Sequence, residues 1–242
     1  MCIVGNQFIS VLASLSASCL SLPVPSQAPG VFISFEGTEG GGKSTQIQIL
    51  GERLRAMGRT VRVLREPGGT PIGEEIRHTL KHSEANRNMT SEAELLLMNA
   101  SRAQLVREVI RPALDAGETV LCDRFYDSTI AYQGYGRQLN LERVRAVIDF
   151  AVGATRPDLT LLLDVPLAVS EARRAQRSSS QISARDRLEE EDRQFFERVH
   201  TGFHAIAKAE PRRVHLIDAT QSVEQVSAKI WETVSRLLPA RI

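Results

Sequence analysis

The segment from Gly37 to Ser44 reads GTEGGGKS and fits the pattern G-x-x-x-x-G-K-[ST]. Its glycines permit backbone angles that turn successive amide groups inward around an anion. The lysine can reach the outer phosphates of a nucleotide, and the serine hydroxyl can ligate Mg²⁺. The segment predicts a loop that binds a nucleoside triphosphate, formed by Gly37, Thr38, Glu39, Gly40, Gly41, Gly42, Lys43, Ser44 and Thr45.

Charged residues also stand at the ends of two later apolar runs. The run RTVRVL is followed by REPGGT, which begins at Arg65, and the run TVLCD ends on Asp123, before Arg124. Because strand ends of a parallel sheet open into one crevice, we expect these three side chains and Lys43 in one cleft. There the carboxylate can handle Mg²⁺ or orient an attacking oxygen, while the arginines hold phosphates. The alternative for Asp123 and Arg124 is a structural ion pair at the strand end.

The hydrophobic pattern places these segments on alternating strands and helices. Short apolar runs at 31–36, 60–64, 119–123, 159–165 and 213–218 alternate with stretches of helical spacing. This alternation predicts a parallel sheet with helices on both faces. The helix signals are Gly58 as a stop, a start near Ile72, capping boxes at Ser91 with Glu94 and at Ser222 with Gln225, a cap at Asn140, and a kink at Pro112.

Composition and charge argue against several classes of protein. The chain has 242 residues, with 30 basic and 29 acidic side chains and a net charge of +1. No overall basic field indicates a nucleic-acid polymer as partner. Cys2, Cys19 and Cys122 show no metal-binding spacing, and an odd count argues against a disulfide framework. We therefore expect a cytoplasmic protein that binds neither nucleic acid polymers nor membranes.

The first 29 residues differ from the rest of the chain. They contain no charged residue, and an apolar run from Phe8 to Leu22 precedes a proline-rich stretch. A targeting segment is one interpretation, although it would usually carry a basic residue near its start, and the run is short for a membrane span. We expect residues 1–29 to be a poorly ordered or dispensable extension, and residues 30–242 to form the folded domain.

Five segments together resemble the bacterial-type thymidylate kinases, which are P-loop nucleoside monophosphate kinases. They are FEGTEGGGKST, REPGGT, NASRAQLV, DRFYDSTIAYQG and RPDLTLLLDV, in the family's order. The resemblance implies a three-layer α/β fold with a five-stranded parallel sheet, helices on both faces, and a lid over about residues 175–188. It also implies ATP-dependent phosphorylation of dTMP to dTDP in the de novo and salvage routes to dTTP, with Mg²⁺ and a homodimer.

The resemblance implies a role for each matching position on the acceptor side. Arg65 and Arg124 resemble the arginines that hold the dTMP phosphate. Asp123 resembles the carboxylate that positions the acceptor oxygen or its Mg²⁺, partly through water and together with Ser44. Glu39 resembles an acidic residue near the acceptor's sugar or a metal ion. Positions that resemble contacts to the nucleoside are Arg102 at the thymine edge, Ser128 and Thr129 at the base, Tyr132 under the sugar, where it disfavours a 2′-hydroxyl, and Gln133 nearby.

Two positions depart from patterns seen in the family. Met98 stands where a phenylalanine usually stacks on thymine; its sulfur can also pack on a base, and a place in the core is the alternative. Gly40 stands where eukaryotic-type members carry an arginine, so we expect a closing lid to supply that charge. The lid candidates are Arg177, Arg185 and Arg187, with Glu189 as a lid acid, and a solvated basic loop is the alternative. The predicted catalytic set is Lys43, Asp123, Arg124, Arg185 and Arg187.

Other functions stay open from the sequence. Met98 leaves room for a kinase of another monophosphate, such as dUMP, or for an inactive relative. A GTPase-type switch would carry an Asn-Lys-x-Asp signature for guanine, which this sequence lacks. The role of Glu66 is also open: it could orient Arg65, or contact a sugar or a metal-bound water.

Overall fold

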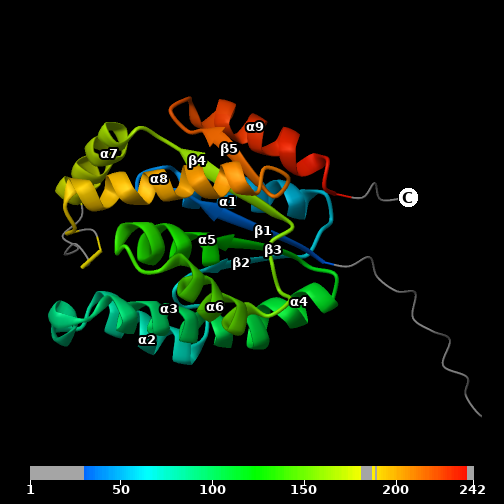
Figure 1. Ribbon diagram of the computed structural model, residues 1–242. Helices are drawn as coiled ribbons and strands as arrows, with labels where there is room; N and C mark the ends of the chain where they lie inside the picture. Colours follow the sequence, from blue (N-terminus) through cyan, green and yellow to red (C-terminus); the bar gives the residue numbers. More distant parts are fainter. Residues whose placement is uncertain (1–29, 181–186, 189, 239–242) are drawn as a thin grey trace, which may run out of the picture.

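The computed structural model describes residues 30–180, 187–188 and 190–238. Five parallel strands lie side by side in the order β2-β3-β1-β4-β5 (Figure 1). Their bounds are β1 Val31–Glu36, β2 Val61–Arg65, β3 Thr119–Asp123, β4 Leu159–Asp164 and β5 Val214–Asp218. This confirms the predicted sheet. Residues 1–29, Arg185, Glu189 and the side chain of Arg177 lie outside the described part.

Helices follow each strand and cover both faces of the sheet. The α-helices are α1 Lys43–Ala56, α2 Pro71–Lys81, α3 Ser91–Leu105, α4 Arg111–Asp115, α5 Tyr126–Thr129, α6 Leu141–Val152, α7 Leu167–Ser180, α8 Arg193–Ala209 and α9 Val223–Ser235. A 3₁₀ turn, η1, spans Glu84–Asn88, and wider π turns form η2, Val106–Ile110, and η3, Ile130–Gly136.

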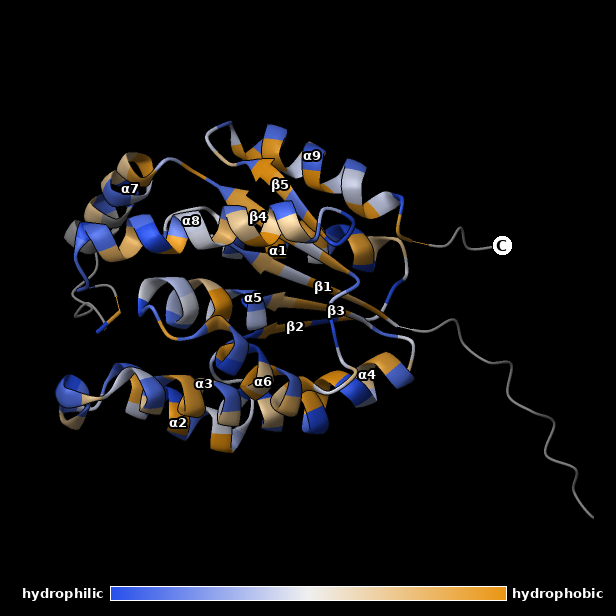
Figure 2. Cartoon of the chain, viewed as in Figure 1, coloured by the Kyte–Doolittle hydropathy of each residue, from blue (hydrophilic) through white to orange (hydrophobic). Residues whose placement is uncertain are grey.

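The strands send alternate side chains into two apolar cores, one on each face. Phe32 and Val120 pack with α3, α6 and α8, whereas Ile33 and Leu121 pack with α1 and α9. In Figure 2 the apolar residues accordingly gather on the strands and on helix faces turned towards them. Because both faces are covered, every residue of β1 is buried, and β1 positions the loop that follows it rigidly.

Most of the predicted helix signals agree with the structure. Asn140 caps α6, and Ser222 forms a capping box with Gln225 at the start of α9. The predicted helix through Pro112 is continuous, but it widens into the π turn η2 just before α4, where proline has no amide hydrogen to donate.

The predicted cap at Ser91 is wrong by one residue. Thr90 caps α3, because its Oγ1 accepts a hydrogen bond from the Ala93 amide at 3.2 Å. Glu94, the expected partner in a capping box, is instead fully buried. It therefore belongs to a different network, described below.

The first part of the segment predicted to form a lid, about residues 175–188, is helical. Residues 175–180 continue helix α7 rather than leaving it as a loop. Residues 181–186, which include Arg185, lie outside the described part, and Arg187 follows them. The helical pattern thus extends further into the serine-rich segment than its composition indicated.

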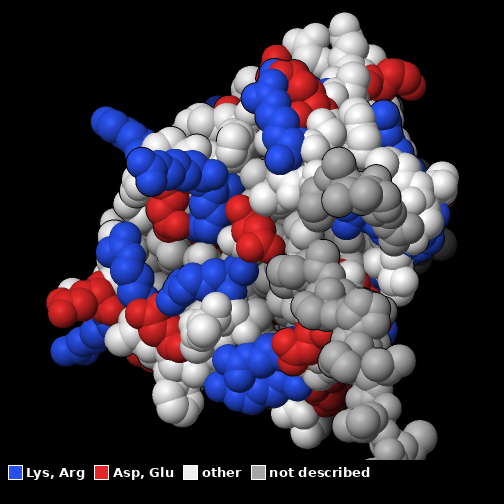
Figure 3. Space-filling view, turned by 90° about the vertical axis from the view of Figure 1, so that its right-hand side faces the viewer, with Lys and Arg blue, Asp and Glu red and all other residues white. Residues whose placement is uncertain are grey.

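Two further features bear on the expected partners. Within the residues that the structure describes, no helix is long and apolar enough to cross a membrane. On the face shown in Figure 3, basic and acidic side chains lie interspersed rather than in a patch of one sign. That mixture agrees with a net charge of +1.

We expect Thr90→Ala to lower the free energy of unfolding by about 1 kcal/mol, because the first turn of α3 loses its capping acceptor. Urea denaturation measures the loss. Ser91→Ala is the matched control and should change stability by less than about 0.5 kcal/mol. A larger loss in Ser91→Ala than in Thr90→Ala would contradict this assignment of the cap.

Candidate active site

Strand register brings the predicted cleft residues to one edge of the sheet. Arg65, the last residue of β2, lies opposite Asp123 at the end of β3. Asp123 in turn lies opposite Phe35 of β1. The loop after β1 runs to Lys43, the first residue of α1. The carboxyl ends of three neighbouring strands therefore carry Arg65, Asp123 and Lys43 to the same cleft, as the sequence predicts.

The loop before α1 is held together by its own lysine. Lys43 Nζ donates to the backbone oxygens of Gly37 and Thr38 at 2.9 and 3.0 Å. Burial, together with the charge of Arg124, lowers the pKa of Lys43 to about 8. An anion near Nζ would favour the charged form again, so this loop suits phosphate.

A hydroxyl and a carboxylate meet beside this loop. Ser44 Oγ donates to Asp123 Oδ2 at 2.8 Å. Both are hard oxygen ligands of the kind that Mg²⁺ prefers, so the pair fits the expected metal ion. They line an open cleft of about 980 Å³, together with Glu39, Gly40, Gly42, Lys43, Thr45, Arg65, Glu66, Arg77, Lys81 and Arg124.

Helix α7 is bonded to the loop from its other side. Ser170 Oγ donates to the backbone oxygen of Glu39 at 2.6 Å. Arg173 donates to the backbone oxygens of Gly40 at 3.2 Å and Ala219 at 3.1 Å. The backbone of the loop is thus tied to the helix that leads towards the serine-rich segment.

Arg124 stands at the centre of the site. Its backbone adopts a left-handed conformation with φ of 69°, which is uncommon outside glycine. Its guanidinium donates to Glu39 at 2.7 Å, Ser128 at 3.0 Å and Tyr132 at 3.3 Å. Burial alone would raise the pKa of Glu39, but the charges of Arg124 and Lys43 outweigh it and lower that pKa to about 2. Glu39 is therefore an anion that fixes Arg124.

A second pocket, of about 500 Å³, adjoins the cleft. It contains all of the predicted nucleoside contacts, namely Met98, Arg102, Ser128, Thr129, Tyr132 and Gln133, with Pro67, Phe125 and Leu188 beside them. Glu39, Glu66, Lys81 and Arg124 line both cavities. An apolar lining with a few polar groups suits a small organic ligand. The two cavities together can hold a nucleoside next to a phosphate-binding loop.

Comparisons with known proteins agree with this arrangement. The family model described as thymidylate kinase matches residues 35–230. The chain belongs to the thymidylate kinase family. It is 48% identical to the thymidylate kinase of Deinococcus radiodurans and 46% identical to that of Syntrophotalea carbinolica. These alignments cover 85% and 86% of this chain, and 97% and 96% of the relatives.

A solved structure gives the same result for the fold. The thymidylate kinase of Ehrlichia chaffeensis superposes with a TM-score of 0.68 at 31% sequence identity, covering 86% of this chain and 99% of that one. The P-loop nucleoside monophosphate kinase fold and the phosphorylation of dTMP, both implied by the resemblance, are confirmed. A kinase for another monophosphate and a GTPase-type switch are not favoured.

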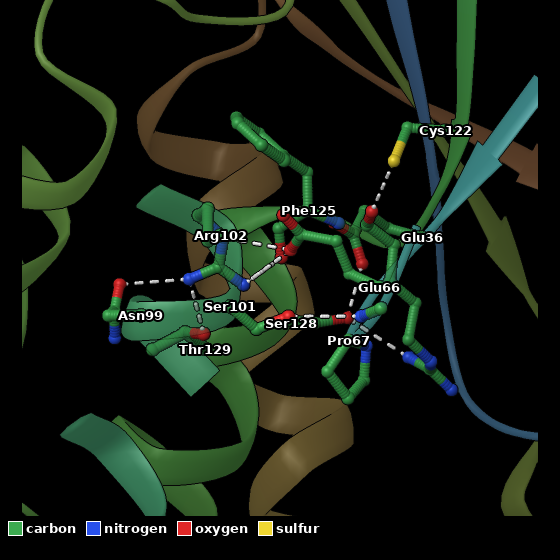
Figure 4. Close-up of polar contacts among 12 residues, drawn as sticks. Glu36, Glu66, Pro67, Asn99, Ser101, Arg102, Cys122, Phe125, Ser128 and Thr129 are labelled. Carbon is green, nitrogen blue, oxygen red and sulfur yellow. Dashed lines mark hydrogen bonds and ion pairs between the residues drawn. The ribbon is translucent and has the colours of Figure 1, made fainter. Parts of the chain in front are cut away.

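Arg102 and Glu66 form a buried ion pair in this thymidylate kinase (Figure 4). Arg102 Nη2 lies 2.7 Å from Glu66 Oε2, and each side chain is only 3% exposed. Arg102 also donates to Asn99 at 2.9 Å and Thr129 at 3.0 Å. Burial raises the pKa of Glu66, although Arg102 opposes the rise. Glu66 therefore positions Arg102 rather than Arg65.

Arg65 has a different carboxylate partner. Its Nη2 donates to Glu74 of α2 at 2.9 Å, and its Nη1 donates to the Pro67 backbone oxygen at 3.2 Å. The Arg65 side chain is 49% exposed and lines the cleft rather than the nucleoside pocket. It thus lies in the cleft that also holds Lys43, as the sequence predicts.

Glu94 contacts three polar residues, of which Gln133 lines the smaller pocket. It accepts hydrogen bonds from Gln133 at 2.7 Å and Arg137 at 3.1 Å, and pairs with Arg187. Arg187 also contacts the Met89 sulfur. The structure therefore places Arg187 next to Glu94 and Met89, and not against the phosphate loop.

Sequence reasoning missed Glu36. This last residue of β1 is fully buried and accepts hydrogen bonds from the Phe125 amide at 2.7 Å and from Ser128 Oγ at 2.5 Å. It thereby positions Ser128 and the segment after Arg124. The rule that singled out Asp123, a carboxylate at a strand end, applies equally to Glu36. No comparable feature of the sequence indicates that Phe125 lines the pocket.

We expect Glu36→Gln to gain stability over the wild type as pH rises. Burial, with the charge of Asp127, raises the pKa of Glu36 from 4.5 to about 8. Below pH 4.5 the Glu36 carboxyl is protonated in both the folded and the unfolded chain. Between pH 4.5 and about 8 it is ionised only in the unfolded chain, so folding must take up a proton. The contribution of Glu36 to wild-type stability therefore falls with rising pH, by roughly 1.4 kcal/mol per pH unit, and this fall ends near pH 8.

Urea denaturation of both proteins between about pH 5 and 9 tests this expectation, because all other titrating groups are shared and cancel in the difference. The difference in free energy of unfolding should grow up to about pH 8 and then level off. A difference that does not change with pH would contradict it.

Proposed function

We propose that this thymidylate kinase transfers the terminal phosphoryl group of ATP directly to the phosphate of dTMP, without a covalent enzyme intermediate. The junction of the two cavities carries this proposal, because they share Glu39, Glu66, Lys81 and Arg124. A nucleoside in the smaller pocket would present its phosphate to the loop. Phosphoryl transfer needs such positioning and charge neutralisation, not a protein nucleophile.

On the donor side, the loop residues Gly37 to Thr45 would hold the ATP phosphates. Lys43 Nζ would exchange its bonds to Gly37 and Thr38 for a bond to phosphate oxygens. We also propose Arg185 and Arg187 as cations that approach the transferred group from the lid. For Arg187 this requires leaving Glu94, its present partner.

Ser44 and Asp123 would hold Mg²⁺, Asp123 partly through water. Their oxygens already lie 2.8 Å apart in the cleft that carries Lys43. When bound, the ion would offset negative charge on the phosphates. Asp123 would in addition orient the acceptor oxygen towards the loop.

On the acceptor side, we assign the dTMP phosphate to Arg65 and Arg124. Arg124 is anchored through Glu39, and its guanidinium lies where the two cavities join. We assign the nucleoside contacts to the pocket as Arg102, Ser128 and Thr129 at the base, Met98 against its face, and Tyr132 and Gln133 near the sugar.

We place the reaction in the cytoplasm, on the route to dTTP, and assign it to residues 30–242 as one domain. The extension of residues 1–29 carries no predicted site residue. Mass analysis of the native N-terminus would show whether the working protein contains it.

Initial rates with ATP, Mg²⁺ and each nucleoside monophosphate test the substrate assignment. We expect dTMP to exceed dUMP in kcat/KM by roughly 10- to 200-fold, the range for one methyl group in an apolar pocket. UMP should be poorer still, because Tyr132 disfavours a 2′-hydroxyl. Lys43→Ala should lower kcat by about 10²-fold or more with the fold intact. Best activity on another monophosphate would overturn the assignment.

We also propose a homodimer formed through the layer of α2, α3 and α6. These helices lie on the same side of the sheet (Figure 1). They also expose large apolar side chains. Phe150 of α6 is 85% exposed, and Leu96 of α3 and Ile72 of α2 are more than half exposed. Apolar side chains left open on neighbouring helices are typical of a surface that another chain covers.

Phe150→Glu should therefore shift the protein from dimer to monomer in size-exclusion chromatography with light scattering, because a charge would be buried in the interface. Met57→Glu is the control, since Met57 is 48% exposed but follows α1 on the other face. This variant should elute like the wild type. A wild-type monomer, or a dimer unaffected by Phe150→Glu, would contradict the proposed interface.

A further inference from the structure

Two histidines and an aspartate converge beside the strand that neighbours the phosphate loop. Asp164 ends β4, and His200 and His204 stand four residues apart on α8. Each imidazole brings its Nε2 to 3.1 Å from the same oxygen, Asp164 Oδ1. All three are partly exposed, and none lines the cleft or the nucleoside pocket. The proposed phosphoryl transfer therefore assigns no role to these three residues.

The spacing of these ligand atoms suits a metal ion. Bonds of about 2.0–2.1 Å at tetrahedral angles place neighbouring ligand atoms about 3.3 Å apart. Both Nε2–Oδ1 distances, at 3.1 Å, are already close to that value. The three ligand atoms all lie within 4.8 Å of one another.

The ligand types select the kind of ion. Imidazole nitrogen suits Zn²⁺, Cu²⁺ and Ni²⁺, whereas Mg²⁺ takes oxygen ligands and keeps several waters. The cluster thus differs in chemistry from the pair of Ser44 and Asp123. Three protein ligands would leave a fourth position for water.

We propose that Asp164, His200 and His204 bind a transition-metal dication such as Zn²⁺, with the proton of each neutral ring on Nδ1. The ion would tie the end of β4 to α8. That helix also carries Phe195 and Phe203, whose rings pack against Tyr132 of the nucleoside pocket at centroid distances of 6.0 and 6.1 Å. A bound ion would therefore stabilise the fold and hold the wall behind the substrate.

Calorimetric titration of the full chain with Zn²⁺ tests the site, without nucleotide, because phosphates chelate the ion. We expect one Zn²⁺ per chain, and a rise in Tm of roughly 5–10 °C at a hundredfold excess over Kd. Asp164→Asn should bind at least about tenfold more weakly, a loss that even an outer partner of a metal site can cause. His200→Gln combined with His204→Gln should abolish binding and the Tm rise.

The chain offers a matched control in His78 and His82. They too stand four residues apart, at the end of α2, with ring centroids 6.2 Å apart. Among the described residues, no carboxylate joins them in a three-ligand group. His78→Gln with His82→Gln should therefore bind Zn²⁺ like the wild type. The Tm of each variant without metal shows that it folds.

The proposal is overturned if the wild-type chain binds no Zn²⁺, or if the variant of His200 and His204 binds as the wild type does. Loss of binding in the control variant would also overturn it, because the ion would then belong to α2. These outcomes do not depend on phosphoryl transfer, so they are distinct from a failure of the proposed mechanism.

Discussion

The ion pair between Arg124 and Glu39 is the interaction on which the rest of the site depends. A site for two phosphorylated substrates must gather cations, and gathered cations repel one another. Glu39 resolves this conflict, because its carboxylate lies 2.7 Å from Arg124 and its charge also acts on Lys43. The cations are therefore oriented before any substrate enters, and less of the binding energy is needed to align them.

Three arginine–glutamate ion pairs lie along the site, and they differ in how far they are exposed to solvent. The arginine side chain is 3% exposed in the pair with Glu66, 17% in the pair with Glu39 and 49% in the pair with Glu74. The end of the site at Arg102 is thus dry and fixed, while the end at Arg65 is open to water. A dry pair is costly to form but holds its geometry. An open arginine can exchange its partner for phosphate at little cost.

Much of this could be predicted from the sequence, because it rests on local pattern and strand ends. The loop before α1, the position of Asp123 and the grouping of six predicted residues around one pocket follow from motifs in which few residue types can serve. The predictions that were wrong depended on the direction in which a side chain points. Glu94 has the spacing of a helix cap, yet it points inwards to Gln133 and Arg137.

Glu66 shows the same limit in another form. Glu66 lies in the bend after β2, whereas its partner, Arg102, lies 36 residues away on helix α3, and no spacing rule joins them. Glu36 stands at a strand end, as Asp123 does, but the sequence does not show that its carboxylate is buried and accepts a hydrogen bond from Ser128. Pairing choices such as these are decided in three dimensions, by which cation or hydroxyl is left within reach.

The bonds from α7 to the phosphate loop have a mechanical consequence. Ser170 and Arg173 donate hydrogen bonds to the backbone oxygens of Glu39 and Gly40. A displacement of the loop would therefore also displace the helix. From Ser170 to its end at Ser180, the helix extends for about 15 Å. A small tilt of the helix at Ser170 would displace its end at Ser180 by a larger distance. Helix α7 thus links the backbone of this loop to a point about 15 Å away.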